Sequence, residues 1–386
     1  MRVRTRLLLL ILPMTLAASL AAPLCPAQAP AEKTPQTTVE SSAKTDAEAQ
    51  ALQQSMPAYR LPPEKLRQAI AYSRIRVLLN FAGSAWGILQ LLLLLTLGVA
   101  AWMRNVVMRV SGNRWIQGFL FTFLFLLITT ILMLPLDLYG HHAAVAYGQS
   151  VQGWGRWTGD LAKGFGLTFV VGGLFVMLLF RVIRKSPRRW WFWFWIPAMI
   201  AVVIGVFVAP VLIDPLFNKF EPLANSNPAL VERLEQVVHR GGMTIPPDRM
   251  FLMKASEKVT ALNAYVTGLG SSKRVVVWDT SIAKATPDEI SFIFGHEMGH
   301  YVLGHIPSTL AFLGALLLVE FYLGYRGAQW LIRRYGRAWH IDSQNDWAAL
   351  VVLMLVFSVL SFLSEPIVNG YSRAQEHAAD IYGQEA

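Results

Sequence analysis

Six long apolar segments most constrain what this chain can fold into. They lie at Val77–Met103, Trp115–Tyr139, Leu161–Val182, Trp190–Ile213, Ile306–Tyr325 and Trp347–Leu363. Each is close to or above the roughly 20 residues with which an α-helix crosses a bilayer, and several carry Trp or Tyr at their ends, as residues at a membrane interface do. Only 15% of the chain is charged, against about 25% in soluble domains. These patterns predict a mainly α, polytopic helical membrane protein with the lipid bilayer as a partner.

Basic residues gather in three of the connections between these segments. The connections hold Arg104, Arg109 and Arg114, then Arg181, Arg184, Lys185, Arg188 and Arg189, then Arg326, Arg333, Arg334 and Arg337. The formal net charge of +10 therefore comes from basic residues beside membrane segments, a pattern typical of membrane topology. We do not predict a nucleic-acid partner. Alternate connections place all three on one side, which the positive-inside rule assigns to the cytoplasm. The other connections and the C-terminal stretch then face the opposite, periplasmic side.

The first 58 residues divide into two parts of different composition. Three arginines precede an apolar run and then Ala27-Gln28-Ala29, which is the pattern of a secretory signal peptide. Pro30 disfavours cleavage at that point, so an uncleaved signal anchor is the alternative. We therefore assign residues 1–29 to a signal peptide or signal anchor and residues 30–58 to a disordered linker without apolar periodicity. An exported N-terminus of this kind indicates a bacterial protein of the inner membrane.

A short motif, His296-Glu297-Met298-Gly299-His300, carries the chemistry of the chain. Two histidines four residues apart lie on one face of an α-helix, so both imidazoles can bind one metal ion while Glu297 reaches a water there. Thr286-Pro287-Asp288-Glu289 predicts a capping box with proline at the first helical position, and Gly304 is a candidate stop. The motif therefore lies in a capped helix, as metal binding requires. The alternative is a pair of core histidines on an ordinary helix.

The segment 214–305 is the only sizeable non-membrane part of the second half of the chain. Asn227-Pro228 predicts the start of a helix that ends at Gly241-Gly242. Three strands are predicted from their composition and bounding turns: Arg249–Met253, Leu262–Thr267 and Arg274–Trp278, the last two joined by a turn at Gly268–Ser272. We therefore expect a small embedded α+β metallopeptidase core. It separates residues 59–213, a helical region with four spans, from residues 306–386, which supply two spans and the helix of the third metal ligand.

A catalytic zinc site takes three protein ligands and keeps a fourth position open. Cysteine cannot supply the third ligand, because Cys25 is the only one in the sequence and lies in the signal-like segment. His305 is the nearest further histidine. It stands one position too early for the metzincin spacing, which would place a histidine where Ile306 stands. That spacing therefore does not identify the third ligand.

A second group of candidate ligands lies near the C-terminus. We expect a helical stretch that begins at Pro366, in which Glu376 and Asp380 lie four residues apart on one face. Glu376 could bind the metal while Asp380 orients a ligand histidine. His377 points about 100° away around the helix. The spacing favours Glu376 and leaves His377 as the alternative.

Four stretches of this sequence resemble the type I CAAX prenyl proteases, the sterile-24-like family of membrane-embedded zinc proteases. They are Asp214–Leu223, Asn263–Gly268, His296–His300 with Gly304-His305, and Asn369–Asp380. With their flanks they cover most of the chain from Tyr59 onward, in the order of the family. The resemblance implies Glu376 as the third ligand, one Zn²⁺ per chain, and a roomy chamber walled by membrane helices. It also implies that the strand of Asn263 lies along the substrate backbone and that Arg373 lies near the site.

The sequence departs from the family in two respects. The chain ends at Ala386, where relatives usually continue, so support for the helix of Glu376 is in question. Eukaryotic relatives present their site to the cytosol, whereas the arginine pattern here favours the periplasmic side. The resemblance therefore bears on the chemistry more than on the orientation.

These residues predict a membrane-embedded zinc metalloendopeptidase that acts on peptides or membrane proteins. Zinc lowers the pKa of a bound water from 15.7 towards ~7, and Glu297 takes the proton and delivers it to the leaving amine. His305 or Arg373 is a candidate donor to the oxyanion. An exposed strand around Asn263 would hold the peptide by strand addition.

Two other functions are compatible with part of the pattern. A catalytically inactive membrane scaffold or chaperone-like protein could keep zinc for structure, but such a site has no need of Glu297. A transporter would rest on the six spans and on Glu320, which interrupts an otherwise apolar segment and is expected to face the protein interior or a water-filled cavity.

Overall fold

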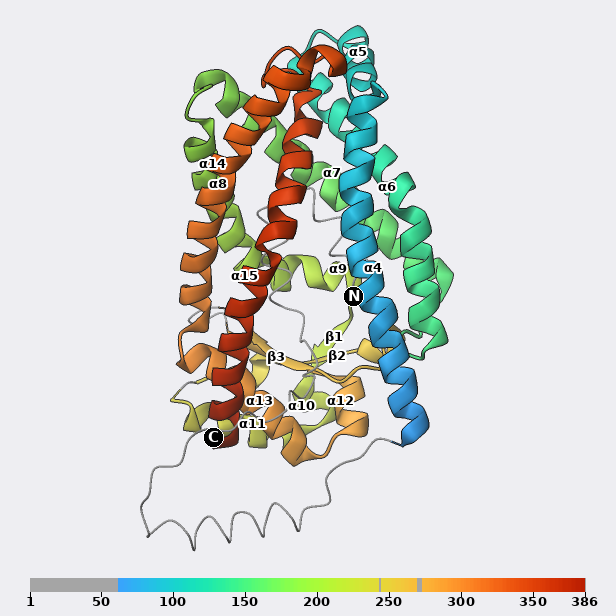
Figure 1. The fold of residues 1–386 in the computed structure, drawn as a ribbon. Helices are drawn as coiled ribbons and strands as arrows, with labels where there is room; N and C mark the ends of the chain where they lie inside the picture. The colour runs from blue at the N-terminus through green and yellow to red at the C-terminus, as the bar shows by residue number, and fades with distance from the viewer. Residues whose placement is uncertain (1–61, 243, 269–272, 386) are drawn as a thin grey trace, which may run out of the picture.

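A bundle of long helices makes up the larger part of the protein (Figure 1). The computed structural model describes residues 62–242, 244–268 and 273–385, so the predicted signal segment and linker lie outside the described residues. The long helices are α4 (Pro63–Thr96), α6 (Arg114–Ala146), α7 (Trp154–Lys185), α8 (Trp190–Val208), α14 (His305–Trp339) and α15 (Ala349–Glu385). Six candidate spans with the length and apolar composition to cross a membrane are found among them, the fourth extending beyond α8 to Phe217. The prediction of a mainly α, multi-pass membrane protein is confirmed.

Two of the predicted helix boundaries are wrong. The first apolar segment does not run unbroken to Met103, because Gly98 adopts a left-handed φ of 72° and a separate helix, α5 (Val99–Val110), begins there. Pro366 does not begin a new helix, because α15 passes through it without interruption. Membrane helices tolerate an internal proline because neighbouring groups can satisfy the freed carbonyl. One helix therefore contains both a membrane span and Glu376.

Aromatic side chains and small residues fill the centre of the bundle. Phe121, Phe180 and Trp190 are fully buried there. At Gly324 of α14 a Cβ atom would lie only 2.6 Å from the ring of Phe357 on α15, so a glycine is needed for the two helices to approach this closely. Glu320 is also buried, and it accepts a hydrogen bond of 2.8 Å from Ser364. The expectation that Glu320 faces the protein interior is confirmed.

The α+β unit contains a four-stranded sheet. Its strands are β1 (Phe220–Pro222), β2 (Met250–Met253), β3 (Ala264–Thr267) and β4 (Arg274–Trp278), in the order β1-β2-β4-β3. The central pair β2–β4 is parallel and the outer pairs are antiparallel. Strand β1 was not predicted, because three residues ending in proline are too short to show alternation. Strand β3 lies at an edge of the sheet, and residues 269–272 of its predicted turn lie outside the described residues.

Two amphipathic helices pack on this sheet, and both begin as their caps predict. Helix α11 (Pro228–Arg240) starts where the Asn227 side chain accepts from the backbone N–H of Leu230. Helix α13 (Pro287–Val302) starts at a complete capping box between Thr286 and Glu289. Their buried faces and those of the strands form one core. Short elements lie between α8 and α13. The π-helix η2 (Ala209–Ile213) and α9 (Asp214–Phe217) belong to the fourth candidate span, and the unit contains α10 (Leu223–Ser226), the 3₁₀ turns η3 (Pro247–Arg249) and η4 (Ala255–Glu257), and α12 (Asp279–Lys284).

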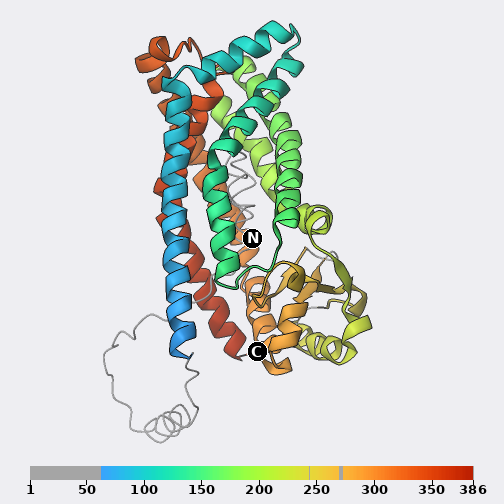
Figure 2. The ribbon, with the colours of Figure 1, turned by 90° about the vertical axis from the view of Figure 1, so that its right-hand side faces the viewer.

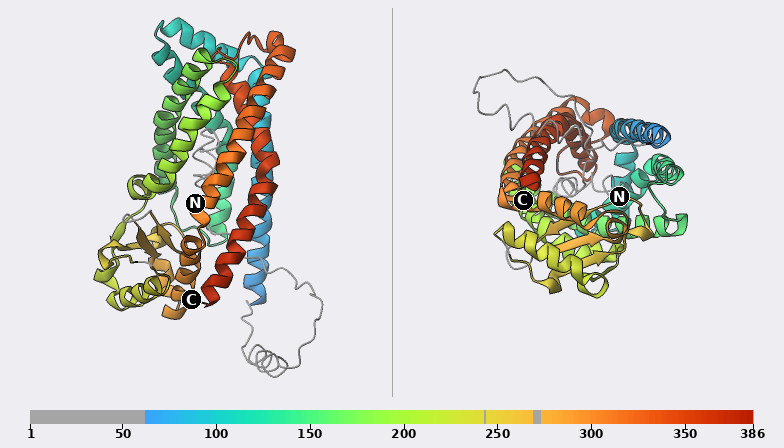
Figure 3. Two further views of the ribbon diagram at one scale, coloured as in Figure 1. Left: turned by 90° about the vertical axis from the view of Figure 1, so that its left-hand side faces the viewer. Right: turned by 90° about the horizontal axis from the view of Figure 1, so that it is seen from below.

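The α+β unit sits at one end of the bundle, and the three basic connections lie at the other end (Figures 1 and 2). Seen from below, the helices are arranged as a ring beside which the unit lies (Figure 3). An ion pair of 2.5 Å between Asp160 of α7 and Lys258 fastens the unit to the bundle. An isolated bridge between Ser150 and Val259 adds backbone pairing at the same place. The bundle therefore fixes the segment that leads into the edge strand β3.

Candidate active site

The candidate site lies where α13 crosses the lower part of α15. Glycines on both helices allow a close approach. A Cβ atom on Gly299 of α13 would lie 3.2 Å from the Cα atom of Ala379, and one on Gly383 of α15 would lie 2.9 Å from the backbone nitrogen of His296. A side chain at either position would therefore push the helices apart. This contact brings the C-terminal part of the chain against the motif helix.

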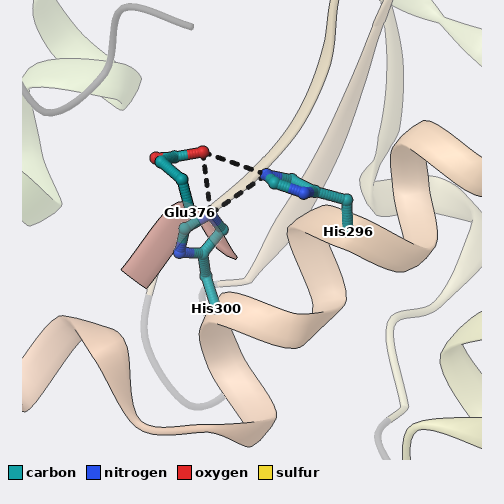
Figure 4. A group of neighbouring side chains, drawn as sticks. All are labelled: His296, His300 and Glu376. Carbon is teal, nitrogen blue, oxygen red and sulfur yellow. Dashed lines mark hydrogen bonds and ion pairs between the residues drawn. The ribbon is translucent and has the colours of Figure 1, made fainter. Parts of the chain in front are cut away.

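Three potential metal ligands converge at the crossing (Figure 4). The Nε2 atoms of His296 and His300 are 3.2 Å apart. The Oε2 atom of Glu376 lies 3.3 Å from Nε2 of His296 and 3.9 Å from Nε2 of His300. A tetrahedral zinc ion with ligands at about 2.0–2.1 Å needs ligand atoms that are about 3.3 Å apart. The donor set and its spacing therefore fit one such ion, with a fourth position free for water.

Each of these histidines is held through its other ring nitrogen. The Nδ1 atom of His296 lies 2.8 Å from a carboxylate oxygen of Asp380, one helical turn beyond Glu376. The Nδ1 atom of His300 lies 2.9 Å from Nδ1 of His305, which begins α14. A carboxylate or a second imidazole that accepts from Nδ1 fixes the tautomer in which Nε2 is free to bind a metal. Asp380 and His305 are therefore placed to orient the two histidines.

The protonation of the site residues is set by burial and by their neighbours. Burial lowers the pKa of His300 to about 4, so this imidazole is neutral, as a metal ligand must be. The hydrogen bond with Glu376 raises the pKa of His296 against the opposing effect of burial. Burial also raises the pKa of Glu297 to about 7; the charge of His296 opposes this rise and that of Glu376 adds to it. A carboxyl group with such a pKa can exchange a proton near neutral pH.

Three further residues named from the sequence lie on, or next to, elements that pack against α13. Asn263 directly precedes the edge strand β3, and its carbonyl accepts from the backbone N–H of Trp278. Arg373 is exposed on α15, three residues before Glu376. His377 is also exposed and is not part of the group of three potential ligands, which contains Glu376 in its place. The structure thus brings the residues of the preferred ligand set together.

Two residues that hold the elements of the site in place, Gln375 and Ser281, were not indicated by any sequence pattern. The amide nitrogen of Gln375 lies 3.3 Å from the carbonyl of His305, and its amide oxygen accepts from Thr309 at 3.0 Å, so Gln375 ties α15 to the start of α14 beside Glu376. The hydroxyl of Ser281 in α12 accepts from the backbone N–H of Asn263 at 2.7 Å and donates to its carbonyl at 2.8 Å. A buried hydroxyl in a short helix has no sequence signal of its own. Gln375 could have been noticed only by its position next to Glu376.

Comparison with known proteins gives the family. The family described as "CAAX prenyl protease N-terminal, five membrane helices" matches residues 48–219, and the one described as "Peptidase family M48" matches residues 224–386. The "Uncharacterized metalloprotease YhfN" of Bacillus subtilis is 36% identical over 332 residues, which cover 86% of this chain and 77% of that protein. This chain belongs to peptidase family M48.

Eukaryotic relatives of this M48 protein carry the name that the sequence resemblance suggested. "CAAX prenyl protease 1" of Saccharomyces cerevisiae is 26% identical over 364 residues, covering 86% of this chain and 80% of that protein. The crystal structure of S. mikatae Ste24p superposes with a TM-score of 0.73 at 23% identity, covering 84% of this chain and 79% of that one. At this identity the superposition shows a shared fold. The resemblance is confirmed, and the chain is a multi-pass membrane metalloprotease.

Proposed function

We propose that this M48 metalloprotease is a zinc-dependent endopeptidase that cleaves peptides or membrane-associated proteins, with one Zn²⁺ held by His296, His300 and Glu376. The observation that carries the proposal is the convergence of three ligand atoms, 3.2–3.9 Å apart, next to Glu297. A structural zinc site would close its fourth position with a protein ligand. Among the described residues the group has three members, which suits a site that keeps one position for water.

Glu297 is the base of the proposed reaction. Zinc held by His296, His300 and Glu376 would supply Lewis acidity and would lower the pKa of a bound water towards ~7. Glu297, whose own pKa is raised to about 7 by burial, would accept a proton from the attacking water and return it to the leaving amine. His305 and Arg373 are the candidate donors to the oxyanion. His305 is already in contact with His300, whereas Arg373 is exposed on the neighbouring helix.

The edge strand β3 is the proposed binding surface for the substrate backbone. It pairs on one side with β4 and lies at the end of the sheet, so its outer backbone groups can pair with an extended peptide. Strand β3 and α13 pack against each other, and the Tyr301 hydroxyl of α13 donates to the carbonyl of Gly268 at the end of β3 at 3.1 Å. Backbone pairing is tolerant of sequence, so the surrounding helices would set the selectivity.

We place the site on the periplasmic side of a bacterial inner membrane. Support comes from the three basic connections, which lie at the end of the bundle opposite the α+β unit (Figure 1), since the positive-inside rule puts such connections in the cytoplasm. A periplasmic site suits exported or membrane proteins as substrates. Quality control of membrane proteins is the role that this position favours.

Cleavage of a quenched fluorescent peptide by detergent-purified protein tests the proposed chemistry. Glu297→Gln should lower kcat by about 10²–10⁴-fold, the usual contribution of a general base, while zinc content stays unchanged. Glu232→Gln, an exposed change on α11 of the same unit, is the matched control and should keep full activity. Chelation should abolish activity, and added zinc should restore it. A wild-type protein that binds zinc stoichiometrically yet cleaves no peptide would point to the inactive scaffold instead.

A further inference from the structure

We propose that Arg114, Arg181 and Arg184 form a binding site for the phosphate of an anionic phospholipid, at the end of the bundle opposite the protease site. Arg114 is the first residue of α6, and the other two lie in the last turns of α7. Helices α6 and α7 pack against each other along the bundle. The proposal does not depend on the proposed peptidase chemistry.

An aromatic pair brings Arg114 and Arg184 to the same place. The guanidinium carbon of Arg114 lies 5.4 Å from the ring centroid of Trp347. The ring centroid of Phe180 lies 4.5 Å from the same tryptophan. Arg184 follows Phe180 by one helical turn and therefore projects from the same face of α7. Trp347 thus brings Arg114 and Arg184 together, and with Arg181 they form an arginine cluster at this end of the bundle.

None of the three arginines of this cluster forms an ion pair within the described part of the chain. The Nη1 atom of Arg184 is buried and has no hydrogen-bond partner among the described residues. Arg114 and Arg181 lie close enough to Arg184 for their charges to repel it. Arg104, near the same end, contrasts with this, because it pairs with Asp346 at 2.5 Å and donates to the carbonyl of His340. A buried guanidinium nitrogen without a hydrogen-bond partner is costly, so an anionic ligand would complete the arginine cluster.

The chemistry of the arginine cluster favours phosphate as that anion. The planar guanidinium fork matches phosphate oxygens in a bidentate manner, which a cluster of lysines would not do. The arginine cluster lies at the ends of membrane spans, and the exposed Trp115 of α6 directly follows Arg114. Phospholipid headgroups occupy this level of a bilayer, and basic side chains there attract anionic lipids. We therefore favour a lipid phosphate over free phosphate, which shares the same binding chemistry.

Thermal unfolding of the detergent-purified full chain, followed with added lipid, tests this site. Phosphatidylglycerol should raise the midpoint of unfolding in a saturable way, whereas phosphatidylcholine and inorganic phosphate at the same concentrations should not. Arg114→Gln and Arg184→Gln should each weaken the apparent affinity for phosphatidylglycerol by about tenfold or more, the effect of losing a charge-assisted hydrogen bond. Arg333→Gln removes an exposed charge of α14 at the same end and should leave the affinity unchanged.

A single symmetric gel-filtration peak and a wild-type midpoint of unfolding without added lipid verify that each variant is folded. If Arg184→Gln fails to fold, Arg184→Lys keeps the charge without the planar fork and should still bind phosphatidylglycerol more weakly than the wild type. Equal affinity for phosphatidylglycerol in the wild type and in both glutamine variants would overturn the proposal. A full shift with inorganic phosphate alone would overturn the assignment to a lipid.

Discussion

The contact between Asp380 and His296 supports one of the three potential metal ligands. At 2.8 Å from Nδ1, the carboxylate holds His296 in the orientation that points Nε2 at Glu376 and His300. Carboxylates in this position raise the basicity of the ligand imidazole as well as fixing its ring. Loss of the Asp380 carboxylate should therefore lower the metal affinity more than it lowers the stability of the fold.

Replacing this carboxylate should weaken metal binding without removing a ligand. We expect Asp380→Asn to lower the affinity for Zn²⁺ by about 10–100-fold, the usual cost of losing such a partner. Competition with a zinc-binding dye measures the change. The exposed Asp248→Asn is the control and should bind zinc as the wild type does. An unchanged zinc affinity in Asp380→Asn would show that the imidazole is oriented by other means.

At the scale of elements, the short helix α12 holds the backbone that leads into β3. Thr280 donates to the carbonyl of Ala261 at 2.7 Å, and Lys284 donates to that of Thr260 at 2.7 Å. Ser281 binds both backbone groups of Asn263. Three side chains of one helix therefore fix the start of the edge strand.

Ser281 is expected to be a positioning residue for the proposed substrate strand. Ser281→Ala should raise KM for a peptide by about three- to tenfold with little change in kcat, since the lost buried hydrogen bonds cost about 1–1.5 kcal/mol and affect ground-state binding. Zinc content should not change. Ser226→Ala in α10, which removes only a local bond to Leu223, is the control. A fall in kcat or in bound zinc at unchanged KM would assign Ser281 to the metal centre instead.

The capping box of α13 provides a test of stability at the same scale. Thr286→Ala should lower the free energy of unfolding of the unit by about 1 kcal/mol. A denaturant titration in which the release of zinc reports unfolding measures this change. The backbone N–H of Thr286 and its hydroxyl both donate to Glu289 and lower the pKa of that carboxyl; Thr286→Ala loses only the part that comes from the hydroxyl. A carboxyl group whose pKa is lower in the folded than in the unfolded protein stabilises the folded state at pH values above its unfolded pKa. This stabilisation is lost as the pH falls through its folded pKa. Acidification should therefore reduce the difference between the wild type and Thr286→Ala.

The elements differ in how far the sequence could predict them. The motif helix and its cap are local, because Thr286, Glu289, His296 and His300 lie within a few turns of each other, and both were predicted. The pairing of α13 with α15 depends on contacts between distant parts of the chain, such as Gly383 against His296. Helical spacing could rank Glu376 above His377, but only the fold brings Glu376 to the histidines. The break at Gly98 was missed because the hydrophobic pattern continues across it.

The orientation of the whole molecule in its membrane can be tested with single cysteines. Cys25 is the only native cysteine, so Cys25→Ser gives a background for Glu232→Cys on α11 and Arg333→Cys on α14. A membrane-impermeant maleimide added to intact spheroplasts should label Glu232→Cys, whereas Arg333→Cys should need permeabilised membranes. Labelling of Arg333→Cys alone in intact spheroplasts would put the α+β unit in the cytoplasm. The maleimide pattern thus decides the side independently of activity.

The unbroken course of α15 has a mechanical consequence for the whole protein. The helix has 37 residues, which corresponds to about 55 Å at 1.5 Å per residue. Its first part is held between lipid-facing helices, and its far end carries the carboxylate of Glu376. A change of a few degrees in tilt would move that end by roughly 2–3 Å over this length. Helices respond to a change in bilayer thickness partly by tilting, so bilayer thickness can affect the position of Glu376. The internal Pro366 is the point at which α15 can bend and reduce this effect.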